Sequence, residues 1–160
     1  MSLRAGGTLP QPVNVVSATI AELDLPGVAG FDGAAAAQRA ALVRVVQFAA
    51  RHAAALEQDG RIGMQAGEDL RLVLEELLTN VVRHAFRDLP GAEGRCRLLL
   101  DPESAVAIIE IEDNGPPFDP FDATNEAGYG LRLVRALARS YSWTLDGGQR
   151  NRLRVLLPLG

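Results

Sequence analysis

Two long segments with helical periodicity dominate the first half of this chain and limit the folds that it can adopt. In residues 34–58, apolar residues recur near helical spacing at Leu42, Val45, Val46, Ala49, Ala53 and Leu56. In residues 69–87, the corresponding apolar stripe consists of Leu70, Leu74, Leu77, Val81 and Ala85. Because a helix with one apolar face has to bury that face against another layer, this pattern predicts a layered domain.

The remaining segments favour a sheet as the second layer. Alternating or β-branched residues predict strands within residues 13–25 and at 95–100, 105–112, 141–145 and 153–159, and a third helix is expected at 131–139. The predicted fold is therefore an α/β (α+β) two-layer sandwich, with a mixed, mostly antiparallel sheet and helices on one face. Residues 1–12 are expected to form a loose tail, and residues 13–160 a single domain.

Composition narrows the classes of function. The chain has 160 residues, of which 48% are hydrophobic and 22% charged, and its net charge of −4 argues against direct nucleic-acid binding. All 16 basic residues are arginine, so no lysine is available to bind phosphate or form a Schiff base. Cys96 is the sole cysteine and excludes an internal disulfide. Without an apolar run of membrane-spanning length, we expect a cytoplasmic protein.

The second predicted helix carries a carboxylate and a carboxamide four positions apart, Glu76 and Asn80. At about 100° per residue they lie about 40° apart on one helix face, whereas Glu75 points away from Asn80. An asparagine oxygen is a hard, neutral ligand suited to Mg²⁺, and Glu76 is placed to accept a proton from a hydroxyl. His84 follows one turn later and either contacts phosphate or satisfies local polar groups. Taken alone, Glu76 and Asn80 also fit an ordinary solvated helix edge.

Two further patterns follow along the chain. Asp113 ends an apolar strand and is followed by Gly115, so its carboxylate is placed to accept a hydrogen bond from an exocyclic amine such as that of adenine. Gly128 and Gly130 precede an apolar helix, where backbone N–H groups can point at phosphate. Each pattern alone also fits a structural role, as a strand-end turn or a flexible helix entry. Their order predicts one nucleotide site.

This order of motifs resembles the GHKL, or Bergerat-fold, ATPase superfamily. Glu76 to Ala85 looks like the N box of the small anti-sigma-factor serine kinases, Asp113 to Pro120 like their G1 box, and Gly128 to Val134 like their G2 box. The resemblance covers roughly residues 35 to 158. It implies the Bergerat ATP-binding fold, with a histidine-kinase-like ATPase domain as its unit.

The resemblance also implies roles for individual residues. Glu76 would be the general base, Asn80 would ligate Mg²⁺, and Asp113 would bind the adenine amine. The rest of the implied ATP-binding set is His84, Gly115, Gly128, Gly130 and Leu131, together with Arg44, chosen over Arg39, as a γ-phosphate contact from the first helix. Relatives of this type bind a sigma factor and phosphorylate a STAS-type antagonist, so the implied function is that of an anti-sigma regulatory serine/threonine-protein kinase using ATP and Mg²⁺.

The sequence departs from that pattern at several positions. Pro117 stands where many relatives have glycine, which stiffens the entry to the predicted lid at 114–127. Arg150 and Asn151 stand where the final strand of relatives often begins Gly-Thr, and Asn151 retains the ability to hydrogen-bond. The lid contains no lysine, which leaves phosphate charge to arginine, Mg²⁺ and backbone N–H groups.

Two other readings compete with the kinase. One is a non-catalytic regulator that binds its protein partners with or without nucleotide. The other is the ATP-binding part of a sensor histidine kinase or a gyrase-like ATPase, which the length of 160 residues disfavours because a dimerisation helix pair or transducer domain does not fit. An apolar patch for homodimerisation is compatible with the anti-sigma reading, but the sequence does not locate one.

Overall fold

The computed structural model describes residues 18–25, 34–85, 92–122, 129–147 and 149–160. Within them, three helices and five strands follow one another along the chain. They are β1 (Ala18–Leu25), α1 (Ala34–Gln58), α2 (Met64–Ala85), β2 (Gly94–Asp101), β3 (Val106–Asp113), α3 (Tyr129–Leu137), β4 (Ser140–Asp146) and β5 (Arg150–Pro158). The predicted tail at 1–12 lies outside the described residues.

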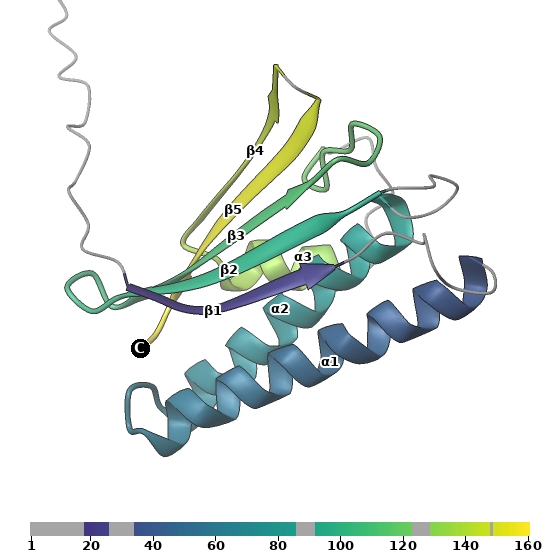
Figure 1. Cartoon of the computed structure of the whole chain (residues 1–160). Coiled ribbons are helices and arrows are strands. Elements are labelled where there is room, and N and C mark those ends of the chain that lie inside the picture. Colours follow the sequence, from purple (N-terminus) through teal and green to yellow (C-terminus); the bar gives the residue numbers. More distant parts are fainter. Residues whose placement is uncertain (1–17, 26–33, 86–91, 123–128, 148) are drawn as a thin grey trace, which may run out of the picture.

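The strands form one sheet in the order β1-β2-β3-β5-β4, and every neighbouring pair among them is antiparallel. The three helices lie together on one face of this sheet (Figure 1). One hydrophobic core fills the space between the layers and draws on all three helices and on the inward-facing residues of the strands. The predicted two-layer α/β sandwich is therefore confirmed.

Helix α2 is the central helix of its layer, with contacts to α1, α3 and strand β3 (Figure 1). Its predicted stripe of Leu70, Leu74, Leu77 and Val81 is buried, and so are Val73, Leu78 and Val82. The apolar face is wider than one stripe because the helix has neighbours on three sides. Only a narrow edge of this helix carries polar side chains along the buried stretch.

Helix α1 has the predicted bounds, but one member of its predicted stripe is wrong. Val45 is fully buried, whereas Val46 is 50% exposed and lies beside the exposed Val43. Val46 is 100° further round the helix than Val45, beyond the sector that packs on α2 and the sheet. Phe48, which the stripe omitted, is buried instead.

The turn between α1 and α2 explains why α2 begins at Met64, five residues before the predicted start at Asp69. Gly60 adopts a φ of 68°, and the Arg61 N–H donates to the Leu56 carbonyl at 2.9 Å, which closes the end of α1. The first turn of α2 combines the exposed Met64 and Gln65 with the small buried residues Ala66 and Gly67, so no large apolar side chain marks its buried face. Helix α3 likewise begins two residues before its predicted start at Leu131.

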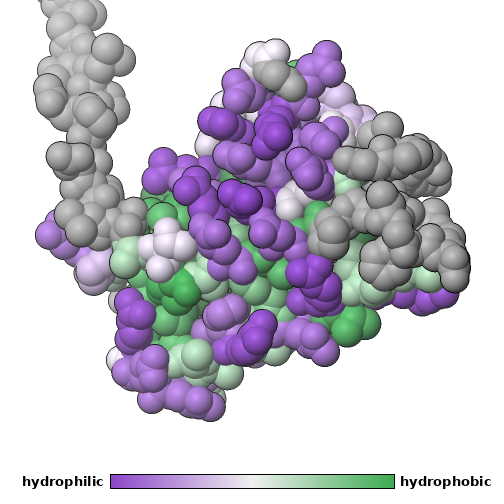
Figure 2. Space-filling model, in the orientation of Figure 1, coloured by the Kyte–Doolittle hydropathy of each residue, from purple (hydrophilic) through white to green (hydrophobic). Residues whose placement is uncertain are grey.

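The outer face of the sheet carries rows of paired charges. Glu110 on β3 contacts Arg97 at 2.7 Å and Arg154 at 3.8 Å, and Arg152 on β5 contacts Glu112 at 3.4 Å and Asp146 at 3.1 Å. Figure 2 shows hydrophilic side chains over the upper part of the molecule, where β4 and β5 lie. Alternation along β5 places these arginines outside and Leu153, Val155 and Leu157 inside.

Cys96 on β2 is fully buried in the core, and burial raises the pKa of its thiol to about 12. Among the described residues, no helix combines the length and hydropathy needed to cross a bilayer.

The adjacent valines of α1 provide a test of its packing. Val45→Ala should lower the free energy of unfolding by about 2 kcal/mol, because it opens a cavity in the core. Val46→Ala should change it by less than about 0.5 kcal/mol, since an exposed helix position loses no packing. Urea unfolding of both variants measures the difference. Equal losses would contradict the assigned orientation of α1.

Candidate nucleotide-binding site

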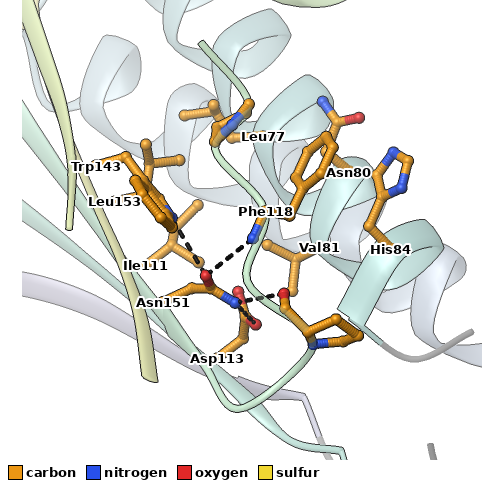
Figure 3. Close-up of a pocket in the computed structure, with 12 residues that line it drawn as sticks. Leu77, Asn80, Val81, His84, Ile111, Asp113, Phe118, Trp143, Asn151 and Leu153 are labelled. Carbon is orange, nitrogen blue, oxygen red and sulfur yellow. Dashed lines mark hydrogen bonds between the residues drawn. The ribbon is translucent and has the colours of Figure 1, made fainter. Parts of the chain in front are cut away.

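A small apolar cavity lies between α2 and the inner face of the sheet, at the ends of β3 and β5. Its volume is about 30 Å³. It is lined by Leu77, Asn80, Val81, His84, Ile111, Asp113, Pro116, Phe118, Pro120, Trp143, Asn151 and Leu153 (Figure 3). Apolar side chains form most of the wall and two polar groups enter from the sheet, which is the usual composition of a site for a flat heterocyclic ring.

Asp113 and Asn151 supply these polar groups as a directly opposed pair on β3 and β5. The Asn151 side-chain nitrogen donates to Asp113 Oδ1 at 2.9 Å, and the Gly115 N–H donates to the same oxygen at 2.9 Å. Both donors therefore use Oδ1. Burial raises the pKa of Asp113, while the hydrogen bonds from Asn151 and Gly115 act in the opposite direction.

Asn151 is a buried hub for the whole cavity. Its amide nitrogen also reaches the Pro116 carbonyl at 3.0 Å, and its amide oxygen accepts hydrogen bonds from the Phe118 N–H and the Trp143 indole N–H, both at 3.2 Å (Figure 3). A side chain that is only 5% exposed thus joins the end of β3, the segment that follows it and strand β4. A threonine at this position cannot donate and accept this many bonds.

The segment after β3 closes over the cavity. The Phe118 ring stacks on His84 with ring centroids 4.3 Å apart and an angle of 16° between the planes. Further along, Phe121 stacks on Tyr141 at 4.2 Å, and its carbonyl accepts a hydrogen bond from Arg135 of α3. A cavity of this volume has room for about one water molecule.

The polar edge of α2 presents the other predicted residues. The Asn80 amide nitrogen donates to the Glu76 backbone carbonyl at 3.0 Å, so its oxygen Oδ1 is not used in that bond. Glu75 instead forms an ion pair with Arg71 at 2.8 Å. The Glu76 carboxylate lies against the backbone of Gly130 in the first turn of α3. Helix α2 therefore directs Glu76, and not Glu75, toward α3.

These donors fit Mg²⁺ of the kind that keeps waters and phosphate oxygens as ligands. The oxygen of Asn80 is hard and neutral, and the Glu76 carboxylate belongs to the next turn of the same helix. Across the described ranges, no group of three or more His, Cys, Asp or Glu side chains is arranged as a metal site.

The structure brings some of the predicted residues together and leaves others apart. Asn80, His84 and Asp113 line the cavity, and Gly115 borders it through its bonds to Asp113 and Asn151. Gly130 and Leu131 lie in α3, and Leu131 is buried in the core rather than in the cavity wall.

Arg44 is exposed on α1 and is not part of the cavity, so its phosphate contact stays a prediction. Gly128 lies outside the described residues.

The two large aromatic residues of the cavity wall, Phe118 and Trp143, were not among the predicted site residues. Trp143 is the single tryptophan of the chain and occupies an inward-facing position on β4, opposite Leu153. Strand alternation places Tyr141 and Leu145 on the same face, so alternation alone does not single out Trp143. Phe118 carried no periodic signal, since it follows two prolines in an irregular segment.

Comparison with known proteins identifies the family to which this domain belongs. The profile of the histidine kinase-like ATPase domain matches residues 35–157, which include α1, α2, α3 and four of the five strands. The chain belongs to the histidine kinase-like ATPase domain family, whose members bind ATP.

A curated relative supports the same family. The sensor protein kinase PilS of Pseudomonas aeruginosa is 30% identical to this chain in an alignment of 127 positions that covers 66% of the chain. The aligned part is 24% of PilS, so the chain spans about a quarter of the length of this relative.

The burial of Asp113 predicts a specific dependence of stability on pH. Because its pKa is raised in the folded protein, the folded state keeps a proton that the unfolded chain has already lost. The resulting stabilisation is complete below the ordinary pKa near 4 and is lost as pH rises through the raised pKa. Asp113→Asn has no such proton.

Wild type should therefore lose stability relative to Asp113→Asn as the pH rises from about 4 toward neutrality. Urea unfolding of both proteins across this range measures the difference. A difference that stays constant with pH would show that Asp113 titrates normally in the folded protein.

Proposed function

We propose that this chain is an ATP-dependent serine/threonine-protein kinase that acts as an anti-sigma regulatory factor. In this proposal it binds a sigma factor and phosphorylates a STAS-type antagonist of that interaction. The observation that carries the proposal is the placement of Glu76 and Asn80 on one edge of α2. Asn80 borders the cavity that contains Asp113, and Glu76 lies one turn further away, toward the first turn of α3.

This arrangement suits transfer of the γ-phosphoryl group of ATP. Asp113 accepts the hydrogen bond of the adenine amine, which directs the phosphates past Asn80 toward α3. The Glu76 carboxylate takes the proton of the partner's serine hydroxyl while that oxygen bonds to the γ-phosphorus and the bond to the β–γ bridging oxygen breaks, releasing ADP. Asn80 would hold Mg²⁺, and the ion would neutralise charge at the phosphates.

The family supports ATP binding, and the resemblance of residues 76–85 to the N box of anti-sigma kinases supports the finer assignment. PilS, a sensor protein kinase, shows that a related domain occurs in a protein kinase. The net charge of −4 agrees with protein partners rather than nucleic acid.

A second candidate is a regulator that binds protein partners without phosphotransfer. The observation that favours it is the small volume of the cavity, about 30 Å³ with Phe118 stacked on His84 in its wall. This candidate keeps the same fold and partners but requires neither Glu76 nor ATP.

Replacement of the proposed base tests the kinase directly. Glu76→Gln should bind ATP within about twofold of wild type but transfer phosphate to STAS-domain proteins of the source organism at least about 10²-fold more slowly, because a carboxamide accepts no proton. Labelled γ-phosphate reports the transfer. Glu75→Gln is the matched control and should remain active, since Glu75 is paired with Arg71. Full activity of Glu76→Gln would refute the assigned base.

Nucleotide binding separates the two candidates. Trp143 lines the cavity as the sole tryptophan, so Mg-ATP should change the intrinsic fluorescence. Asp113→Asn should weaken ATP binding at least about tenfold. Loss of a hydrogen bond to a charged acceptor costs about 1.4 kcal/mol or more, and about 1.4 kcal/mol corresponds to a tenfold change in Kd. Glu112→Gln is the control, because Glu112 pairs with Arg152 on the outer face. No response at millimolar ATP would favour the nucleotide-independent regulator.

A further inference from the structure

We propose that Gly130 is a positioning residue for Glu76, and that its missing side chain provides the room in which the carboxylate of Glu76 lies. The inference rests on the proposed function, in which Glu76 is the base. It assigns Gly130 a different task from the predicted one of following phosphate. The two residues come from neighbouring helices, α2 and α3, which lie side by side beneath the sheet (Figure 1).

The Glu76 carboxylate occupies the space that a side chain at position 130 would need. A Cβ built on Gly130 would lie 3.0 Å from Cγ of Glu76 and would overlap its carboxylate carbon and Oε2. The Glu76 side chain can avoid such a Cβ only by rotating away. Any side chain at position 130 therefore moves the carboxylate from its present place.

The first turn of α3 also favours a negative charge at this place. Backbone N–H groups at a helix start lack partners within the helix and carry a partial positive charge. Gly130 is the second residue of α3, so the Glu76 carboxylate lies against that turn. The missing Cβ allows the approach, and the helix start attracts the charge.

The position of a general base controls its efficiency. A base has to lie within about 2.6–3.2 Å of the proton that it accepts, and a displacement of about 1 Å can cost about 10²-fold in rate. An alanine at position 130 would displace Glu76, whereas Gly130 is not among the residues that line the cavity with Asp113 and Asn151. Loss of phosphotransfer should then exceed loss of nucleotide affinity.

The chain contains a matched pair outside the site. Gly67 in α2 also faces a glutamate, and a Cβ built there would lie 2.6 Å from Cγ of Glu57 and closer to its carboxylate. Glu57 and Gly67 line no part of the cavity. Gly67→Ala therefore controls for the general effects of replacing a helical glycine that faces a carboxylate.

A thermal double-mutant cycle on the nucleotide-free protein tests the contact. Gly130→Ala should lower the Tm of wild type or leave it unchanged, but raise the Tm of Glu76→Ala, since alanine is the better helix former once the carboxylate is absent. The two effects should differ by at least about 2 °C for a chain of this size. Equal effects in both backgrounds would overturn the proposal.

Spectroscopy provides a test that does not need a stable variant. In wild-type protein, NMR should show a nuclear Overhauser effect between the Gly130 Hα protons and the Glu76 Hγ protons. The carboxyl ¹³C signal of Glu76, assigned by its loss in Glu76→Ala, should shift in Gly130→Ala and not in Gly67→Ala. Absence of the Overhauser effect would refute the contact even if Gly130→Ala does not fold.

Phosphotransfer kinetics test whether the contact between Gly130 and Glu76 matters for catalysis. Gly130→Ala should lower kcat for phosphotransfer at least about tenfold more than it weakens ATP binding, while Gly67→Ala should change neither. A lowered ATP affinity with unchanged kcat would overturn the positioning role and leave Gly130 as a phosphate-binding glycine. If the cycle and the NMR signals show the contact but no protein is phosphorylated, the proposed function fails and the contact remains.

Discussion

Burial of α2 on three sides is the constraint on which the rest of this structure depends. Its contacts with α1, α3 and the sheet require apolar residues around most of its circumference, including Val73, Leu74, Leu77 and Leu78. Polar side chains are tolerated only on the remaining edge. That edge faces α3 and the end of β3. Packing of the core therefore determines where the side chains of Glu76, Asn80 and His84 lie.

The cavity also depends on a second constraint: the buried side-chain amide of Asn151 requires hydrogen-bond partners. Asn151 lies among apolar side chains and satisfies both ends of its carboxamide with groups from three segments. Because an unsatisfied buried amide is costly, these segments are held in a single arrangement. The same bonds that fix Asp113 also fix the backbone of Phe118, and the Phe118 ring then closes the cavity against His84.

The fold was largely predictable from sequence because its signals are local and periodic. The bounds of α1 and the hairpin of β2 and β3 follow directly from helical spacing and strand alternation. The misplacement of Val46 had a different cause: spacing defines a stripe but not its width, which depends on how many neighbours a helix has. The start of α2 was missed because its first turn buries only the small residues Ala66 and Gly67, so the apolar stripe becomes recognisable only from Leu70 onward.

The site was predictable in part. Motif order brought Asn80, His84 and Asp113 to one place, since each sits at a defined point of a regular element. Phe118 and the many bonds of Asn151 were not accessible, because they depend on the path of an irregular segment after β3. The contact of Gly130 with Glu76 depends on how closely two helices approach, and no spacing within one helix contains that information.

The ion pairs on the outer face of the sheet have a consequence for the inner face. Glu110 opposes Arg154 and Glu112 opposes Arg152 in the pairing of β3 with β5, and the next opposed pair is Asp113 with Asn151. A slip of β5 by one residue would turn its arginines into the core and misalign these charges. The ion pairs on the outer face and the apolar side chains on the inner face thus favour the same register, the one in which Asn151 meets Asp113.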